Sequence, residues 1–160
     1  MVKTFIGICI LKRSPWQEII AVDVRGMGTS AKLEIGYDKK NMALDIYEVV
    51  KQYKFEKVFI AGHDISSLVY AASYNQVSNI RAANKWYQSF PQDAIDSKSY
   101  QKLSMPVLGL AGEGNNMLEA GLQTISGHYQ WHTIPETGHF LIEESPCEVA
   151  ELMIKFLVDK

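Results

Sequence analysis

Short apolar runs alternate with amphipathic stretches along this 160-residue chain. The apolar runs are rich in β-forming residues and lie at residues 5–11, 18–24, 57–61, 107–111 and 129–134. Stretches whose apolar residues recur at near-helical spacing lie at residues 41–54, 66–74 and 145–158. Such alternation is typical of a mostly parallel sheet flanked by helices. We therefore predict an α/β fold, in a single domain that spans residues 1–160.

The last helix carries start signals of its own. Ser145 can cap its N-terminus, Pro146 stands at the first helical position, and Glu148 follows three residues after the cap. Residues 80–103 differ from the rest of the chain, because they are aromatic and polar without a strand-like pattern. We predict one helix there, followed by an irregular connection.

Composition narrows the possible partners. The formal net charge of −2 leaves no basic surplus to neutralise phosphates, so no nucleic-acid partner is expected. Cys9 and Cys147 lie far apart without metal-type spacing, which favours reduced thiols in a cytosolic setting. The apolar run 5–11 is too short to span a bilayer, and Lys12 and Arg13 follow it in place of a signal cleavage pattern. We expect a cytoplasmic protein that does not enter membranes.

The segment Gly62-His63-Asp64-Ile65-Ser66 stands between a predicted strand and a predicted helix. A small residue on each side of a central residue is the pattern of a nucleophile elbow, which exposes the central side chain above the sheet. The candidate nucleophile is therefore Asp64, whose carboxylate can attack a carbon and form an alkyl-enzyme ester. The backbone N–H of Ile65 is the candidate donor to developing oxyanion charge.

Hydrolysis of such an ester needs a base, and His139 is the candidate. It follows the predicted strand 129–134 and precedes the last helix, so it falls at the sheet edge where sites gather. Plainer roles stay open at this point: Asp64 could be a helix N-cap, and His139 could be structural. A dinucleotide loop at residues 26–28 is disfavoured, because the further glycine of that motif is lacking.

Several segments together resemble a known family. Residues 23–30 (DVRGMGTS), 36–38 (GYD) and 62–65 (GHDI) resemble the epoxide hydrolase and haloacetate dehalogenase branch of the α/β hydrolases. Similarity continues at residues 81–87 (RAANKWY), 105–113 (MPVLGLAGE) and 137–140 (TGHF), so that it covers most of residues 16–160. The resemblance implies the α/β-hydrolase fold and the hydrolysis of an epoxide or a carbon–halogen bond, with no metal or organic cofactor.

The family's functional residues can be carried over one by one. Asp64 matches the nucleophile and His139 matches the base. Tyr87 matches the tyrosine that donates to the epoxide oxygen or helps to hold the leaving group, although core packing is the alternative role for this aromatic residue. The helix at about residues 80–91 would be the remainder of the family's cap domain.

The chain also departs from the family pattern. No His-Gly-Phe-Pro-like loop is found in residues 1–18, and Ser66 replaces the usual glycine. Asn115 stands where part of the family has the acid of the catalytic triad. Glu113 or Glu136 could substitute for that acid, although neither matches a family acid position.

The predicted sheet is incomplete relative to the family. The chain passes from the elbow helix directly to the cap-like helix, so a strand and most of the cap are missing. Residues 5–11 could replace a central strand, but only about six residues separate them from the next strand, whereas a parallel crossover needs about a dozen. They could instead pair antiparallel, or a second copy of the chain could complete the sheet. The alternative to a hydrolase of small-molecule substrates is therefore a noncatalytic remnant or an interaction module.

Overall fold

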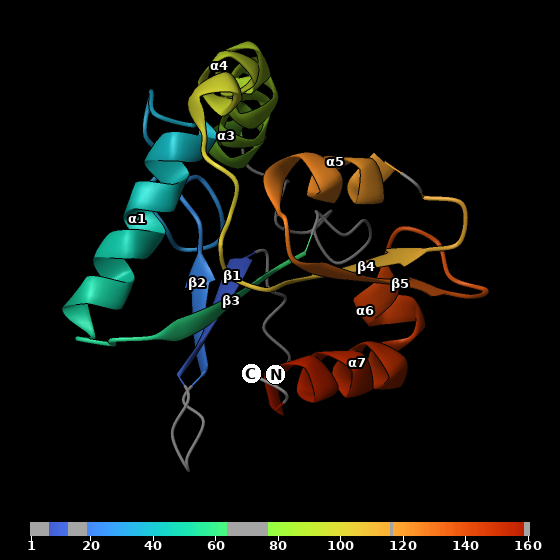
Figure 1. Cartoon of the computed structure of the whole chain (residues 1–160). Helices are drawn as coiled ribbons and strands as arrows, with labels where there is room; N and C mark the ends of the chain where they lie inside the picture. Colours follow the sequence, from blue (N-terminus) through green and yellow to red (C-terminus); the bar gives the residue numbers. More distant parts are fainter. Residues whose placement is uncertain (1–6, 13–18, 64–76, 116, 159–160) are drawn as a thin grey trace. The chain divides into compact units, whose positions relative to one another are not determined.

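The computed structural model describes residues 7–12, 19–63, 77–115 and 117–158. These residues belong to two compact units, of which the first ends at Ser99 and the second begins at Tyr100 (Figure 1). Both units contain strands and helices, so the predicted α/β class is confirmed. The single-domain organisation of residues 1–160 stays a prediction.

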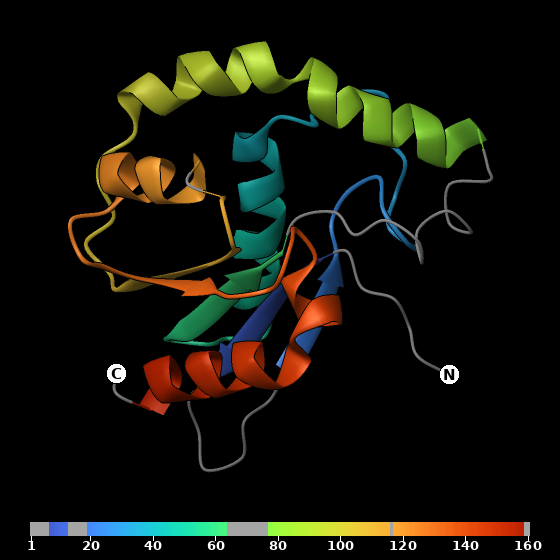
Figure 2. The ribbon, with the colours of Figure 1, turned by 90° about the vertical axis from the view of Figure 1, so that its right-hand side faces the viewer.

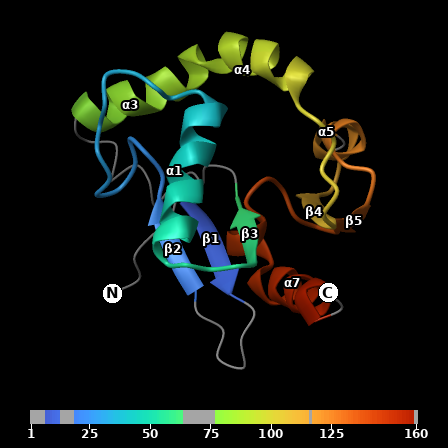
Figure 3. The same ribbon diagram turned by 60° about the vertical axis from the view of Figure 1, so that its left-hand side comes forward.

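The first unit contains a three-stranded sheet with the order β2-β1-β3 (Figure 3). Its strands are β1 (Gly7–Lys12), β2 (Ile19–Asp23) and β3 (Val58–Gly62). The central strand β1 runs antiparallel to both neighbours, so that β2 and β3 point the same way. The part of the run 5–11 that lies in β1 therefore takes a central position and pairs antiparallel, which was one of the two arrangements left open. The short connection to β2 accounts for this direction, because it cannot form a parallel crossover.

Helix α1 (Lys39–Gln52) supplies much of the core of the first unit. Its N-terminus is capped by Asp38, whose carboxylate accepts from the backbone N–H of Asn41 at 2.9 Å. Met42 and Ile46 lie one turn apart on its buried face and pack against Val24 and Met27. The helix predicted at residues 41–54 is thus confirmed, with its start two residues earlier.

The predicted irregular connection begins later than residue 91, because the chain is helical to Ser99 and becomes irregular only from residue 100. Helix α3 (Val77–Gln88) is followed after Ser89 by α4 (Phe90–Asp96) and by a short 3-10 turn, η1 (Ser97–Ser99). The two helices run end to end in an arc (Figure 2). Pro91 in the first turn of α4 is compatible with a helix start, since its missing N–H would be unpaired there anyway.

The second unit contains a parallel strand pair. Strands β4 (Val107–Gly112) and β5 (Tyr129–Ile134) are joined by α5 (Met117–Ile125), which lies on one face of the pair. This arrangement confirms the predicted strands at residues 107–111 and 129–134. It also confirms that parallel strands with a covering helix are part of the fold.

Two further helices follow β5 on the opposite face of the strand pair (Figure 1). The short α6 (Leu141–Glu144) was not predicted, whereas α7 (Pro146–Val158) begins at the predicted proline. Leu141 and Val149 pack with the fully buried Ile134, and these three side chains form a hydrophobic cluster in the second unit.

Two further predictions concern helices: the helix at residues 66–74, and the expectation that no helix enters a membrane. The helix predicted at residues 66–74 lies outside the described residues. Among the helices that are described, none is long and apolar enough to cross a membrane.

Candidate active site

The predicted nucleophile segment begins where β3 ends. Gly62 is the last residue of β3, and His63 follows it. Asp64 and Ile65 lie outside the described residues, as does Ser66. Their roles as nucleophile, oxyanion donor and small flanking residue therefore stay predictions.

The glycine loop after β2 is shaped by the side chain of Asp23. The carboxylate of Asp23 accepts from the backbone N–H of Thr29 at 2.9 Å, and the Ser30 hydroxyl donates to the Asp23 carbonyl at 2.6 Å. Gly28 has a φ of 48°, and a Cβ atom there would lie 2.0 Å from the Asp23 carboxylate. A side chain at Gly28 would be strained, because the backbone there is left-handed and the Asp23 carboxylate would have to move. The hydrogen bonds of Asp23 and Ser30 give these two residues a structural role in the loop.

Arg25 ties the same loop to α1. Its guanidinium donates two hydrogen bonds to the Asp45 carboxylate, at 2.6 and 2.7 Å, and a third to the Gly36 carbonyl at 2.8 Å. The hydrogen bonds to Asp45 raise the pKa of Arg25 above its ordinary value. Planar two-point pairing of this kind fixes geometry as well as charge. Arg25 is therefore engaged within the fold.

Helix α3 is fastened to the loop that follows β2. The Lys85 ammonium pairs with the Glu34 carboxylate at 2.7 Å, and the Trp86 indole N–H donates to the Arg25 carbonyl at 3.3 Å. The buried Ala82 lies beside Gly26, which has a φ of 84°. The predicted cap remainder thus packs on the segment whose sequence resembles the family.

Tyr87 lies near the end of α3 and is 59% exposed. Its ring centroid lies 5.4 Å from that of Phe90, at a tilted angle. This exposure does not support core packing as the role of Tyr87. A role as donor to a substrate oxygen stays a prediction.

The loop that carries His139 follows β5 and is held against the end of β4. The Glu113 backbone N–H donates to the Thr137 carbonyl at 3.0 Å. The buried Thr137 hydroxyl donates to the Ile134 carbonyl at 2.7 Å. A Cβ atom on Gly112 would lie 2.0 Å from the Gly138 carbonyl oxygen, so the absence of a side chain permits this close approach.

The predicted substitute acids take part in the backbone structure of this loop. The Glu113 carboxylate accepts from the Glu136 backbone N–H at 3.3 Å. Glu136 itself has a φ of 56°, in the left-handed region. Asn115 closes the turn after β4, where its N–H donates to the Gly112 carbonyl at 3.2 Å. A triad role for Glu113 or Glu136 stays a prediction.

A different carboxylate, that of Glu144, was not identified from the sequence. It contacts the backbone on both sides of His139. Glu144 accepts from the backbone N–H of Gly138 at 2.7 Å and from that of Phe140 at 2.9 Å. These two hydrogen bonds and the nearby His139 charge lower the pKa of Glu144. The His139 ring stands edge-on to Phe140, with centroids 5.1 Å apart. The sequence contained one signal for this contact. A glutamate one turn after a helix start can accept a hydrogen bond from the backbone N–H of the N-cap residue.

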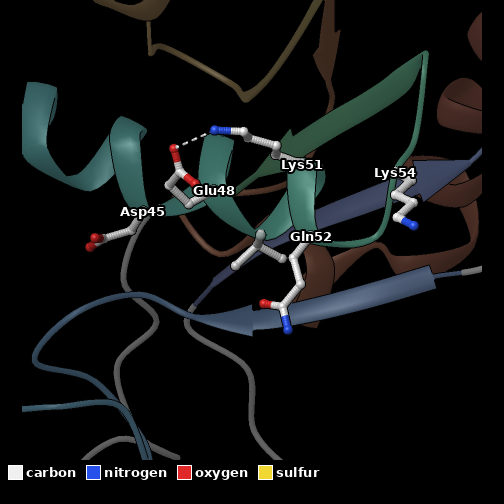
Figure 4. Close-up of a pocket in the computed structure, with 6 residues that line it drawn as sticks. Asp45, Glu48, Lys51, Gln52 and Lys54 are labelled. Carbon is white, nitrogen blue, oxygen red and sulfur yellow. Dashed lines mark ion pairs between the residues drawn. The ribbon is translucent and has the colours of Figure 1, made fainter.

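Other groups of side chains among the described residues lack the features of an active site. No group of three His, Cys, Asp or Glu side chains there could hold a metal ion. A shallow depression at the C-terminal half of α1 is lined by Asp45, Glu48, Val49, Lys51, Gln52 and Lys54 (Figure 4). Its Lys51 pairs with Glu48 at 3.6 Å on the surface, and Asp45 is engaged by Arg25. This depression contains no nucleophile–base pair and is not a candidate active site.

Comparison with known proteins adds two partial matches. No protein-family model matches the chain. A soluble epoxide hydrolase from Corynebacterium sp. (strain C12) is 46% identical over 46 residues, which make up 29% of this chain and 16% of that enzyme. The crystal structure of wild-type Cfl2 from Burkholderia cenocepacia superposes with a TM-score of 0.71 at 14% identity, over 83% of this chain and 76% of that one. The structural match concerns the fold alone, and the two matches together suggest an α/β-hydrolase-like relationship.

Proposed function

We propose that this chain is a hydrolase of epoxides or small halogenated acids, in which Asp64 is the nucleophile and His139 is the base. The observation that carries the proposal is the 46% identity over 46 residues to a soluble epoxide hydrolase. Two structural observations support it, because β3 ends at Gly62, shortly before Asp64 in the chain, and β5 ends at Ile134, shortly before His139. Carboxyl ends of strands are where sites gather in α/β folds.

The first proposed step forms a covalent ester. A carboxylate oxygen of Asp64 bonds to a substrate carbon while the carbon–oxygen bond of the epoxide, or the carbon–halogen bond, breaks. The epoxide oxygen takes a proton from the Tyr87 hydroxyl, which solvent later restores, whereas a halogen leaves as halide. The exposed position of Tyr87 keeps its hydroxyl available for such a donation.

The second proposed step releases the product. His139 takes a proton from a water molecule, whose oxygen attacks the ester carbonyl carbon of Asp64. The Ile65 backbone N–H stabilises the oxyanion that develops. Collapse of this intermediate expels the product as an alkoxide, which takes the proton from the imidazolium and becomes an alcohol. Asp64 is left as a carboxylic acid, which releases its proton to solvent and so restores the carboxylate. Asp64 and water supply the oxygen atoms transferred, and Tyr87, His139 and solvent supply the protons, so the proposed reaction needs no metal or organic cofactor.

A noncatalytic role is the second candidate, and specific observations favour it. The central strand β1 runs opposite to both of its neighbours, which breaks the sheet order that the family resemblance implies. Asn115 also stands where the family acid is expected. In this alternative the chain keeps an α/β framework for interaction. A second copy of the chain that completes the sheet stays a proposal, which light scattering after size-exclusion chromatography would test.

Intact-protein mass after incubation with styrene oxide and, separately, chloroacetate tests the enzyme proposal. Cys147 is an exposed free thiol, and thiols attack both reagents, so all proteins carry Cys9→Ser and Cys147→Ser. Asp64→Asn removes the nucleophile with little change of shape. The matched control is Asp96→Asn, which removes a surface carboxylate that pairs with Gln92.

We expect a mass gain in the parent and in Asp96→Asn, and none in Asp64→Asn. Replacement of His139 by glutamine should prolong the adduct, because ester hydrolysis then lacks its base. A single turnover in heavy-oxygen water should leave the label in Asp64 and not in the product. Absence of both adduct and product with either compound would refute the enzyme proposal for these substrates.

A further inference from the structure

The carboxylate of Glu144 accepts hydrogen bonds from the backbone N–H groups on both sides of His139. Together these two hydrogen bonds form the Glu144 grip. One oxygen, Oε2, accepts from the Gly138 N–H at 2.7 Å, and the other, Oε1, accepts from the Phe140 N–H at 2.9 Å. The φ and ψ torsions of Gly138 and His139 lie between these two N–H groups. Residue 138 is a glycine, the residue type with the greatest backbone freedom. The two hydrogen bonds therefore restrict the part of the chain that sets the direction of the His139 side chain.

The Glu144 grip is anchored to the hydrophobic cluster in the second unit. Glu144 is the last residue of α6, and its own N–H donates to the Phe140 carbonyl at 2.9 Å. Residue 140 is thus bonded to residue 144 through both its N–H and its carbonyl. Leu141, at the start of α6, is buried against Ile134 and Val149. A packed side chain thus fixes the short helix from which Glu144 reaches back.

The rest of the loop is held independently of Glu144. The Thr137 carbonyl accepts from the Glu113 N–H, and Gly112 lies against the carbonyl groups of Thr137 and Gly138. Loss of the Glu144 carboxylate would therefore loosen the backbone around His139 while residue 137 stays in place. The Phe140 carbonyl would keep the hydrogen bonds that it accepts from the N–H groups of Glu143 and Glu144. This separation makes a local effect on His139 measurable without loss of the fold.

The chemistry of the grip requires both oxygens of a carboxylate. A glutamine keeps one carbonyl oxygen and would turn its NH₂ group toward the second N–H, so one of the two hydrogen bonds would be lost. Hydrogen bonds to a charged acceptor are also stronger than those to a neutral one. The lowered pKa of Glu144 agrees with bonding to its charged form. The adjacent Glu143 is exposed, and its carboxylate has no hydrogen bond among the described residues.

We propose that Glu144 is a positioning residue, which orients the loop of His139 for the attack of water on the ester. The proposal rests on the function proposed above, because it assigns Glu144 to the second step of that reaction. Glu144 acts through the backbone and does not touch the substrate. Its loss should therefore slow ester hydrolysis and leave ester formation by Asp64 nearly unchanged.

The test compares Glu144→Gln with the matched control Glu143→Gln in the cysteine-free background. Both variants remove one negative charge from α6. Only Glu144→Gln alters the hydrogen bonds to Gly138 and Phe140. The rates of ester formation and of ester loss are followed separately by intact mass. We expect ester loss to slow by about tenfold or more in Glu144→Gln, since small misplacement of a catalytic group has effects of this order or larger. Ester formation should stay within about twofold, and Glu143→Gln should match the parent in both steps.

A second measurement does not depend on activity. Backbone amide relaxation in ¹⁵N-labelled protein should show lower order parameters at residues 138–140 in Glu144→Gln, and parent values in Glu143→Gln. The amide proton signals of Gly138 and Phe140 should also move, because both lose a charged acceptor. If Glu144→Gln does not fold, Glu144→Asp, which keeps the charge on a shorter side chain, replaces it in both measurements with the same expectation.

The possible failures are distinguishable. A parent that forms no ester would refute the proposed function, and the order parameters would then decide by themselves whether Glu144 orients the His139 loop. Unchanged order parameters and amide signals in Glu144→Gln would overturn the positioning role. Equal rates of ester loss in the parent and in Glu144→Gln would overturn it as well, even with an altered loop.

Discussion

The close approach between β4 and the His139 loop permits a sharp prediction about Gly112. A Cβ atom there would meet the Gly138 carbonyl oxygen at 2.0 Å and the Thr137 carbonyl oxygen at 2.5 Å. Ordinary van der Waals contact of a Cβ begins at 3.4 Å. Both obstacles are backbone atoms, which cannot rotate away as a side chain could. Gly112→Ala must therefore push the loop away from the strand.

The expected cost follows from this displacement. Overpacking of a well-packed region costs about 1–3 kcal/mol. Moving Thr137 also lengthens the 3.0 Å hydrogen bond that its carbonyl accepts from Glu113, a bond of a kind that contributes about 1 kcal/mol. We expect Gly112→Ala to lower the free energy of unfolding by about 3 kcal/mol.

The matched control makes the same chemical change in open space. Gly121 lies within α5, and apart from the neighbouring residues and the nearby backbone of the helix itself, no described atom lies within 4 Å of a Cβ built on it. Gly121→Ala should therefore raise the free energy of unfolding by about 0.5–1 kcal/mol, the usual gain for this change inside a helix. Urea denaturation, followed by circular dichroism, measures both variants. The reasoning would be refuted if Gly112→Ala lay within about 0.5 kcal/mol of the parent, or if both variants changed stability in the same direction.

The remaining predictions concern the first unit. Ile46→Ala should lower the free energy of unfolding by about 2–4 kcal/mol, because Ile46 is only 3% exposed, whereas Leu44→Ala on the 52% exposed side of α1 should change it by less than about 0.5 kcal/mol. Asp45→Asn should cost about 1–2 kcal/mol, because the partly exposed Arg25 loses its charged two-point partner. The lowered pKa of Asp38 should make the parent lose stability in acid, and Asp38→Asn should lose less.

The sign of the acid effect follows from the direction of the pKa shift. The hydrogen bonds from Asn41 hold the pKa of Asp38 below its ordinary value of about 3.9, so its stabilisation is fully present above that value. It is lost as the pH falls through the lowered pKa. Urea denaturation at a series of pH values from about 5 to 2 measures this loss. A steeper loss of stability in acid for Asp38→Asn than for the parent would contradict the role of Asp38. Equal losses in the free energy of unfolding for Ile46→Ala and Leu44→Ala would contradict the assignment of the buried face of α1.

Much of the fold could be predicted because its signals are local. Alternating apolar runs located β2 to β5, and near-helical spacing located α1. The start of α7 at Pro146 followed from a cap, a proline and a glutamate within a few residues. The helix at α4 was missed although Pro91 marks its first turn, because the aromatic and polar residues around it hid the pattern.

The candidate site could be predicted only in part, and for different reasons. The place of His139 after β5 follows from chain order, and the structure agrees with that order. Its neighbour Glu144 was overlooked because α6 spans only four residues, too few for a periodic pattern. The acids considered instead, Glu113 and Glu136, do not match a family acid position, and Glu113 bonds to the loop backbone in the structure.

The sequence by itself determined the strands, the helices α1 and α7 and the positions of the candidate catalytic residues along the chain. It did so because periodicity, caps and turns act over a few residues. It did not reveal α4, α5 and α6. Only the tertiary structure decided the direction of β1, the pairing of Arg25 with Asp45 and the approach of Gly112 to Gly138. These features depend on which surfaces meet after folding, and an apolar pattern specifies that a face is buried without naming the partner that buries it.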